Sequence, residues 1–199
     1  MKESLRIAVA EDERDMREYL QEALSRLGHE VVAVADSGRR LVEQCRAVDP
    51  DLVIADITMP DGDGIEASAA VNRVKKTPVI LVSAHHDAAL LERAAANPVL
   101  AYLVKPIKEP DLAAAIAVAL SRFRQAQAAE KEAADLRQAL EDRKVIERAK
   151  GAVIKRLGLE EDEAFRRMRS LASNQNRKLV EVARAVLAAE EIYHQLEQL

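Results

Sequence analysis

Carboxylate, hydroxyl and ammonium side chains follow directly after four short apolar segments in the first half of this 199-residue sequence. Glu11 and Asp12 follow one segment and Asp56 follows another, while Ser83 and Lys105 follow two more. Three neighbouring carboxylates repel one another unless a cation or a proton compensates them. Mg²⁺ suits such a group, because one or two carboxylates typically hold it while its waters leave room for a phosphate.

The chemistry that this set predicts is phosphoryl transfer. Asp56 would be the nucleophile, since carboxylates form acyl phosphates. Ser83 and Lys105 would bind the phosphoryl oxygens, with Lys105 acting as a point charge. The competing interpretation is that each acid only caps a helix, which is a common role for acids after a strand. The occurrence of all five side chains at strand ends favours the chemical interpretation.

The segments that must position these residues alternate with helical patterns. Strands are predicted at 5–10, 31–34, 52–55, 79–82 and 101–104, and helices near 13–27, 37–48, 64–75, 86–96 and from 109 onward. This alternation predicts an α/β domain with a doubly wound, five-stranded parallel sheet that is covered on both faces. Ligands of such sheets bind beyond the carboxyl ends of the strands. We therefore expect the five candidate side chains to converge there.

Composition restricts the class of protein. With 49% hydrophobic and 32% charged residues, the chain has the composition of a globular protein. No apolar run approaches the roughly 20 residues of a membrane helix, and the first residues lack the apolar segment of a signal peptide. The single cysteine, Cys45, cannot form an internal disulfide. We therefore predict a cytoplasmic protein that has no membrane partner.

The distribution of helix-breaking residues divides the chain into two parts. No proline follows Pro110, and Gly151 and Gly158 are the only glycines after Gly64. Acidic residues predominate before this boundary and basic residues predominate within 137–184, which predicts different partners for the two parts. The apolar positions of the connecting segment are too irregular for a strong coiled coil. The predicted organisation is an α/β domain at 1–120, a long helical linker at 121–135 and a helical domain at 136–199.

Four segments of the first part resemble the receiver domain of bacterial two-component response regulators. They are AEDE (10–13), DITMPDGDG (56–64), SA (83–84) and YLVKP (102–106), and the resemblance covers about residues 5–120. It implies a flavodoxin-like fold in which Asp56 accepts phosphate from a sensor histidine kinase. It also implies a protein that takes phosphate onto its own aspartate, without independent turnover of a substrate.

The same resemblance assigns roles around the phosphorylated residue. It implies that Mg²⁺ is held by Glu11, Asp12 and Asp56, with help from the backbone carbonyl of Thr58. The remaining residues would bind the phosphoryl group and transmit the signal; they are Ser83, Tyr102 and Lys105.

The second part has the pattern of a small three-helix bundle with a basic rim. Its predicted core positions recur at helical spacing: Ile146, Ala149, Val153 and Leu157, then Ala164, Phe165, Met168 and Leu171, and finally Leu179, Val182, Ala183 and Val186. A second stripe of the first helix consists of Lys144, Arg148, Gly151 and Lys155, with Lys150 beside it. Cations around a glycine predict a surface that another backbone can approach closely.

Segments of this bundle resemble the ANTAR domain over about residues 136–195. They are RxxIExAKG (143–151), ExEAF (161–165), MRxxA (168–172), NRKL (176–179) and VA (182–183). The resemblance implies binding of paired RNA hairpins in leader transcripts and a role in transcription antitermination. Lys150, Gly151 and Arg169 match the motif and, with the three cations of the stripe, are the predicted RNA contacts.

Other interpretations of the helical part stay open. The basic stripe is also compatible with a DNA-binding domain, a phosphorylation-dependent protein-interaction module or a merely solvated helix face. The third helix offers few side chains that could read a DNA groove, which favours RNA. Phe165 and Tyr193 are the only aromatic residues of the domain, so we expect phosphate and polar base contacts to dominate. The sequence does not fix whether phosphorylation drives formation of a homodimer.

Overall fold

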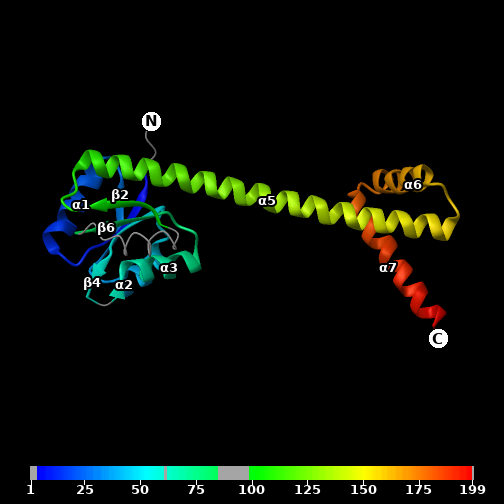
Figure 1. The fold of residues 1–199 in the computed structure, drawn as a ribbon, viewed down its shortest axis with the longest axis horizontal. Coiled ribbons are helices and arrows are strands. Elements are labelled where there is room, and N and C mark those ends of the chain that lie inside the picture. Colours follow the sequence, from blue (N-terminus) through cyan, green and yellow to red (C-terminus); the bar gives the residue numbers. More distant parts are fainter. Residues whose placement is uncertain (1–3, 61, 85–98, 199) are drawn as a thin grey trace. The chain divides into compact units, whose positions relative to one another are not determined.

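The computed structural model describes residues 4–60, 62–84 and 99–198. Contacts divide the chain into two units, Met1–Gln127 and Ala128–Leu199. One long helix, α5 (Glu109–Leu157), contributes residues to both units (Figure 1). The helix predicted near 86–96 lies outside the described residues, and the predicted bounds of the linker stay a prediction. No helix of the described part is both long enough and apolar enough to span a membrane.

The first unit contains the predicted five-stranded parallel sheet. Its strands are β1 (Arg6–Ala10), β2 (Glu30–Ala35), β3 (Leu52–Asp56), β6 (Val79–Ser83) and β7 (Val99–Val104), in the order β2-β1-β3-β6-β7. All four strand pairs are parallel. Strands β3 and β6 are buried along their whole length, which explains their uninterrupted apolar sequences. The predicted fold class is therefore confirmed.

Helices cover both faces of this sheet (Figure 1). Helices α2 (Gly38–Val48) and α3 (Gly64–Val74) contribute to one core cluster, and α1 (Arg14–Arg26) and the start of α5 contribute to the other. Alternate strand residues enter the two clusters, since successive side chains of a strand point to opposite faces: Ala8 belongs to the first cluster, and Ile7 and Val9 belong to the second.

The second unit packs the end of α5 against α6 (Glu161–Asn174) and α7 (Leu179–Glu197). Its core is small and centred on Ala149, Met168 and Ala183, one residue from each helix. Helix α5 ends before Gly158, whose φ of +62° is the left-handed conformation that glycine adopts readily at a helix end.

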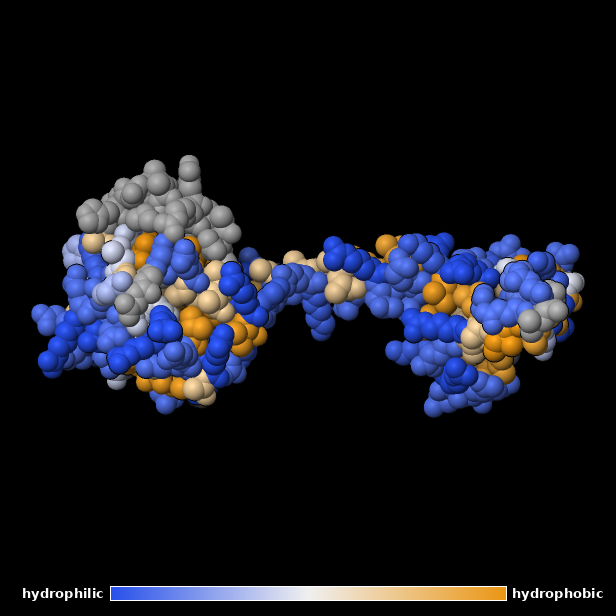
Figure 2. Space-filling view, turned by 90° about the horizontal axis from the view of Figure 1, so that it is seen from below, coloured by the Kyte–Doolittle hydropathy of each residue, from blue (hydrophilic) through white to orange (hydrophobic). Residues whose placement is uncertain are grey.

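Two core predictions for this unit are wrong. Leu157 is 57% exposed and Leu171 is 44% exposed. Leu157 is the last residue of α5 and lies beyond the core residues contributed by that helix. The buried side of α6 is centred on residues spaced by four, Ala164, Met168 and Ala172, which leaves Leu171 at its edge. Apolar residues thus reach the surface of this unit, where they appear orange in Figure 2.

Candidate functional site

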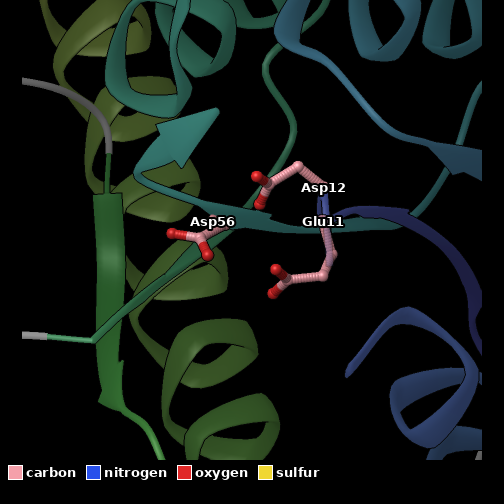
Figure 3. Close-up of side chains that lie close together, drawn as sticks. All are labelled: Glu11, Asp12 and Asp56. Atoms are coloured by element: carbon pink, nitrogen blue, oxygen red, sulfur yellow. The ribbon is translucent and has the colours of Figure 1, made fainter. Parts of the chain in front are cut away.

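The predicted acidic residues meet at the carboxyl edge of the sheet. Glu11 follows β1 directly and Asp56 is the last residue of β3. Carboxylate oxygens of Glu11, Asp12 and Asp56 lie within 4.8 Å of one another, and Figure 3 shows the first two side chains turned toward Asp56. Glu11 and Asp56 are buried, whereas Asp12 is exposed. The cluster therefore joins two buried carboxylates to one that solvent reaches.

Lys105 provides the positive charge of this cluster. Its ammonium nitrogen lies 2.9 Å from Oε1 of Glu11 and 2.5 Å from Oδ2 of Asp56. Its backbone N–H donates a hydrogen bond to the carbonyl oxygen of Ser83, which fixes the turn after β7. Burial opposes the charged form, but the hydrogen bonds to Asp56 and Glu11 outweigh it and raise the pKa of Lys105. The ammonium thus stays charged and holds the two carboxylates together.

The Glu11 carboxyl has a raised pKa. Burial raises its pKa to about 7, and the charge of Asp56 adds to the increase, while the hydrogen bond from Lys105 opposes it. Its second oxygen, Oε2, is buried and accepts no hydrogen bond from the residues that the structure describes. An all-oxygen donor set with an unpartnered buried oxygen fits a hard cation such as Mg²⁺. We therefore expect Glu11, Asp12 and Asp56 to hold this ion.

The raised pKa of Glu11 makes a prediction about pH. Because metal binding requires the ionised carboxylate, Mg²⁺ affinity should rise about tenfold from pH 6 to pH 8, with release of a proton. The stability of the metal-free protein should show the opposite trend and fall as the pH rises. There, stability that Glu11 contributes below its usual pKa of 4.5 is lost as the pH rises through about 7. Calorimetric Mg²⁺ titrations at the two pH values measure the first effect. Equal affinities, or the same dependence in Glu11→Gln, would contradict it.

The loop after β3 fixes the position of Asp56. The backbone N–H of Thr58 donates a hydrogen bond of 3.0 Å to Oδ1 of Asp56. Two short strands, β4 (Thr58–Met59) and β5 (Gly62–Asp63), pair antiparallel and return the chain to α3. The Asp63 side chain accepts a hydrogen bond from the N–H of Ile65 and caps α3. The role of the Thr58 carbonyl as a metal ligand stays a prediction.

Gly64 is a positioning residue that the sequence analysis did not identify, although it ends the DGDG motif. A Cβ atom built on Gly64 would lie 1.9 Å from the carbonyl oxygen of Asp56. The Gly64 N–H also donates a hydrogen bond to the carbonyl oxygen of Ile57. The first turn of α3 thus packs directly on the backbone of Asp56, at a distance that excludes any side chain.

Gly64→Ala is therefore expected to displace the backbone of Asp56. We expect the free energy of unfolding to fall by about 1–3 kcal/mol, the usual cost of overpacking, and phosphorylation to slow. Chemical denaturation and labelling by a small phosphodonor measure the two effects. Gly151→Ala is the matched control, because a Cβ atom there would meet nothing within 4 Å. A Gly64→Ala protein of unchanged stability would show that the loop yields easily.

Arg17 is a second residue that the sequence did not reveal. Its Nη1 donates hydrogen bonds to the backbone carbonyl oxygens of Glu11, at 2.7 Å, and of Asp12, at 3.0 Å. It thereby holds the turn that carries both acids. No motif marks this residue, because the contact depends on how α1 leaves the turn.

Ser83 and Tyr102 lie on neighbouring strands. Ser83 ends β6 and is buried, and Tyr102 lies within β7, half-buried against the core cluster of α2 and α3. Tyr102 is in register with Leu81, two residues before Ser83, so Ser83 and Tyr102 belong to the same face of the sheet. This arrangement suits the predicted switch pair, and the movement itself stays a prediction.

In the second unit, the predicted basic stripe lies on an exposed face of α5, away from the buried Ala149. Lys144, Arg148, Gly151 and Lys155 are all exposed. Lys144 pairs with Glu141 at 2.7 Å, whereas Arg148 and Lys155 form no ion pair with any described residue. Among the residues that the structure describes, and apart from the backbone of α5 itself, nothing lies within 4 Å of a Cβ atom built on Gly151, so packing does not require glycine there.

Lys150 and Arg169 have different surroundings from the stripe. The Lys150 ammonium lies 2.6 Å from carboxylates of both Glu147 and Glu161, and its side chain is 13% exposed. The hydrogen bond to Glu147, followed by that to Glu161, raises the pKa of Lys150. Because Glu161 begins α6, Lys150 ties this helix to α5. The guanidinium of Arg169 lies 5.9 Å from the ring centre of Phe165 on the same helix.

Comparisons with known protein families match both units. Residues 7–117 match the response regulator receiver domain, and residues 134–187 match the ANTAR domain. The transcriptional regulatory protein PdtaR of Mycobacterium tuberculosis is 40% identical over 182 residues, which cover 92% of this chain and 89% of that protein. The chemotaxis protein CheY of Thermotoga maritima is 32% identical over 104 residues, 52% of this chain and 87% of that protein.

Solved structures resemble the first unit. A signal receiver domain of a modulated diguanylate cyclase from Desulfovibrio desulfuricans aligns with a TM-score of 0.58 at 26% identity, covering 62% of this chain and 98% of that one. The receiver domain of the putative response regulator NarL from Mycobacterium tuberculosis aligns with a TM-score of 0.56 at 31% identity, covering 61% and 98%. The two family matches and the similarity to PdtaR confirm both resemblances predicted from the sequence.

Proposed function

The chain belongs to the response regulators that combine a receiver domain with an ANTAR domain, and from this premise we propose a cytoplasmic regulator whose RNA binding is controlled by phosphorylation. Its targets are RNA hairpins in leader transcripts, and its action is transcription antitermination. The observation that carries the RNA-binding half is the cationic face of α5, defined by Lys144, Arg148, Gly151 and Lys155. Two of its cations lack a carboxylate partner among the described residues, and its glycine has no packing role.

The proposed reaction begins with a sensor histidine kinase that carries a phosphohistidine. A carboxylate oxygen of Asp56 attacks the phosphorus, so that a P–O bond forms and the P–N bond breaks, leaving the electron pair on the imidazole nitrogen. Lys105, which now bonds Asp56 at 2.5 Å, would transfer this contact to a phosphoryl oxygen. The buried position of Asp56 lowers access of water to the acyl phosphate.

Charge at the phosphoryl group is balanced by the same site. Glu11, Asp12 and Asp56, with the backbone carbonyl of Thr58, would hold Mg²⁺. When bound, the ion neutralises charge on the phosphoryl oxygens. Lys105 supplies the second positive charge from its own strand end.

The signal leaves the site through Ser83 and Tyr102. We propose that the Ser83 hydroxyl moves to the phosphoryl group and that the Tyr102 ring follows into the space it leaves. Ser83 and Tyr102 lie on the same face of the sheet, which supports a coupled movement, because a shift of one side chain there changes the packing of the other.

RNA phosphates would bind the cationic face through Arg148 and Lys155, with Lys144 beside them. Gly151 lets the RNA backbone approach the helix. Lys150 is held by two carboxylates, so we propose that it supports RNA binding by joining α5 to α6. Arg169 adds a cation on α6.

A homodimer would bring two such units to two hairpins. Leu136 and Leu140 of α5 are 60% and 59% exposed and lie one turn apart, which supports pairing of this helix with a second copy. Two linked modules gain affinity for paired hairpins through effective concentration, without any new contact. A DNA-binding output has less support, since Arg177 and Arg184, two exposed cations of the third-helix region, pair with Glu181 and Asp142.

The test is a comparison of ligands with and without phosphate. The protein, incubated with Mg²⁺ and a small acyl phosphate donor, should bind a leader RNA hairpin at least tenfold more tightly than duplex DNA of the same sequence. Fluorescence anisotropy with labelled ligands measures both affinities. Equal binding of RNA and DNA would favour a DNA-binding regulator. Binding of neither, in either phosphorylation state, would favour a protein-interaction module.

A further inference from the structure

Two helices of the second unit are joined by a stacked pair that no predicted site residue belongs to. The guanidinium carbon of Arg156, near the end of α5, lies 3.9 Å from the ring centre of Tyr193 on α7. Both residues are exposed, and Tyr193 is 49% exposed. Tyr193 also lies beyond residue 187, where the match to the ANTAR domain ends. The pair is therefore a feature of this chain that the family match does not explain.

We propose that Arg156 and Tyr193 form a stacking platform for an unpaired RNA base. The inference rests on the proposed function and adds a ligand class to it, a base displayed in a hairpin loop. Proteins recognise such bases by stacking them on aromatic rings and on guanidinium planes. In this pair the guanidinium carbon already lies over the ring, and both residues keep surface open to solvent.

Charge around the pair suits a nucleic acid. Arg166 and Arg167 share the carboxylate of Glu163, and Arg184 pairs with Asp142. Arg156, in contrast, makes no ion pair within the described ranges, and its neighbour Lys155 belongs to the cationic face. A base stacked on the platform would thus keep its own phosphate close to two uncompensated cations.

The platform would add base stacking to the phosphate and polar base contacts expected from the sequence. Stacking on Tyr193 would require an unpaired nucleotide. The phosphate contacts on the cationic face would depend on charge alone. Stacking tolerates every base, so the platform would select loop structure more than loop sequence.

Two other roles are compatible with the geometry. The pair could simply fasten the end of α7 to α5. The surface could also bind an apolar protein partner, because Leu157, Ile192 and Leu196 are 57%, 58% and 61% exposed. Apolar residues on this unit are orange in Figure 2. The uncompensated charge of Arg156 and Lys155 favours RNA over an apolar partner, and substitutions separate all three roles.

The experiment uses the phosphorylated full-length chain and a leader hairpin in which each loop nucleotide is replaced in turn by an abasic site. Tyr193→Leu should weaken binding of the intact hairpin about tenfold, within the range for the loss of one stacked base. Tyr193→Phe, which keeps the ring, should bind like the parent. At one loop position the abasic hairpin should bind the parent and Tyr193→Leu equally. Ile192→Ala is the matched control, because it removes exposed apolar surface next to Tyr193 without touching the ring.

The outcomes are distinct. If Tyr193→Leu weakens every hairpin equally, including all abasic ones, the pair only positions α7 and the platform is wrong. If Ile192→Ala weakens hairpin binding as much as Tyr193→Leu, the effect comes from the apolar surface of α7 and not from the ring, and the platform is wrong. If the parent binds hairpins and Tyr193→Leu binds them equally well, the inference fails while the proposed function stands. Failure of the parent to bind any hairpin overturns both. Thermal unfolding of each variant shows that the comparison is made on folded protein.

Discussion

Asp56→Asn is expected to eliminate phosphorylation by a small phosphodonor in Mg²⁺ and, with it, the phosphorylation-dependent part of RNA binding. The amide cannot form the acyl phosphate, and neither Glu11 nor Asp12 occupies the end of β3 where Lys105 meets the carboxylate. Intact-protein mass spectrometry measures the label, and hairpin titration measures the coupling. We expect complete loss of the label, whereas the affinity of the unphosphorylated protein for RNA should not change.

Controls separate the nucleophile from the metal ligands. Asp12→Ala and Glu11→Gln should still be labelled when Mg²⁺ is raised far above its normal requirement, because they leave Asp56 intact.

Lys105→Ala should fold but be labelled poorly, and its metal-free form should be less stable, since the repulsion between Glu11 and Asp56 is no longer offset. Stable labelling of Asp56→Asn would show that another side chain accepts the phosphate.

The double variant Arg148→Ala, Lys155→Ala is expected to weaken hairpin binding by about 15- to 30-fold at 0.15 M salt. Release of about 0.7–0.9 counterions per phosphate contact gives a factor of about 4–6 for each contact at this salt concentration. The slope of log affinity against log salt should become shallower by about 1.4–1.8. Arg184→Ala is the control, because this exposed cation already has a carboxylate partner in Asp142, at 3.2 Å. Binding that falls while the salt slope stays constant would exclude direct phosphate contacts.

Gly151→Ala extends this prediction with two effects of opposite sign. Alanine is favoured over glycine inside a helix by about 0.5–1 kcal/mol, and the added Cβ atom meets no described residue outside the local backbone of α5, so the free energy of unfolding should rise. RNA affinity should nevertheless fall, because the methyl group stands where the RNA backbone approaches. A more stable protein with unchanged affinity would mean that the glycine is not part of the interface.

The sequence alone was sufficient for the sheet and for the convergence of its functional groups. Alternation of apolar runs with helical patterns is a local property, and parallel strands must place their carboxyl ends at one edge. Glu11, Asp56 and Lys105, which the structure brings into contact, could therefore be assigned to one site before any distance was known. The stripe around Gly151 was predictable for the same kind of reason, since helical periodicity places residues 144, 148, 151 and 155 on one face.

Tertiary structure decided which of these charged groups have an ion-pair partner within the protein and which are left to bind a ligand. The pKa of Glu11 depends on burial and on Lys105, 94 positions away in the chain. Lys150 and Arg148 are equivalent cations in the sequence, but only Lys150 meets the first residue of α6 as well as an acid of its own helix. Gly64 and Arg17 act on backbone atoms, which no side-chain pattern records. Periodicity identifies the face on which a residue lies, whereas burial and ion pairing depend on distant segments that meet only when the chain folds.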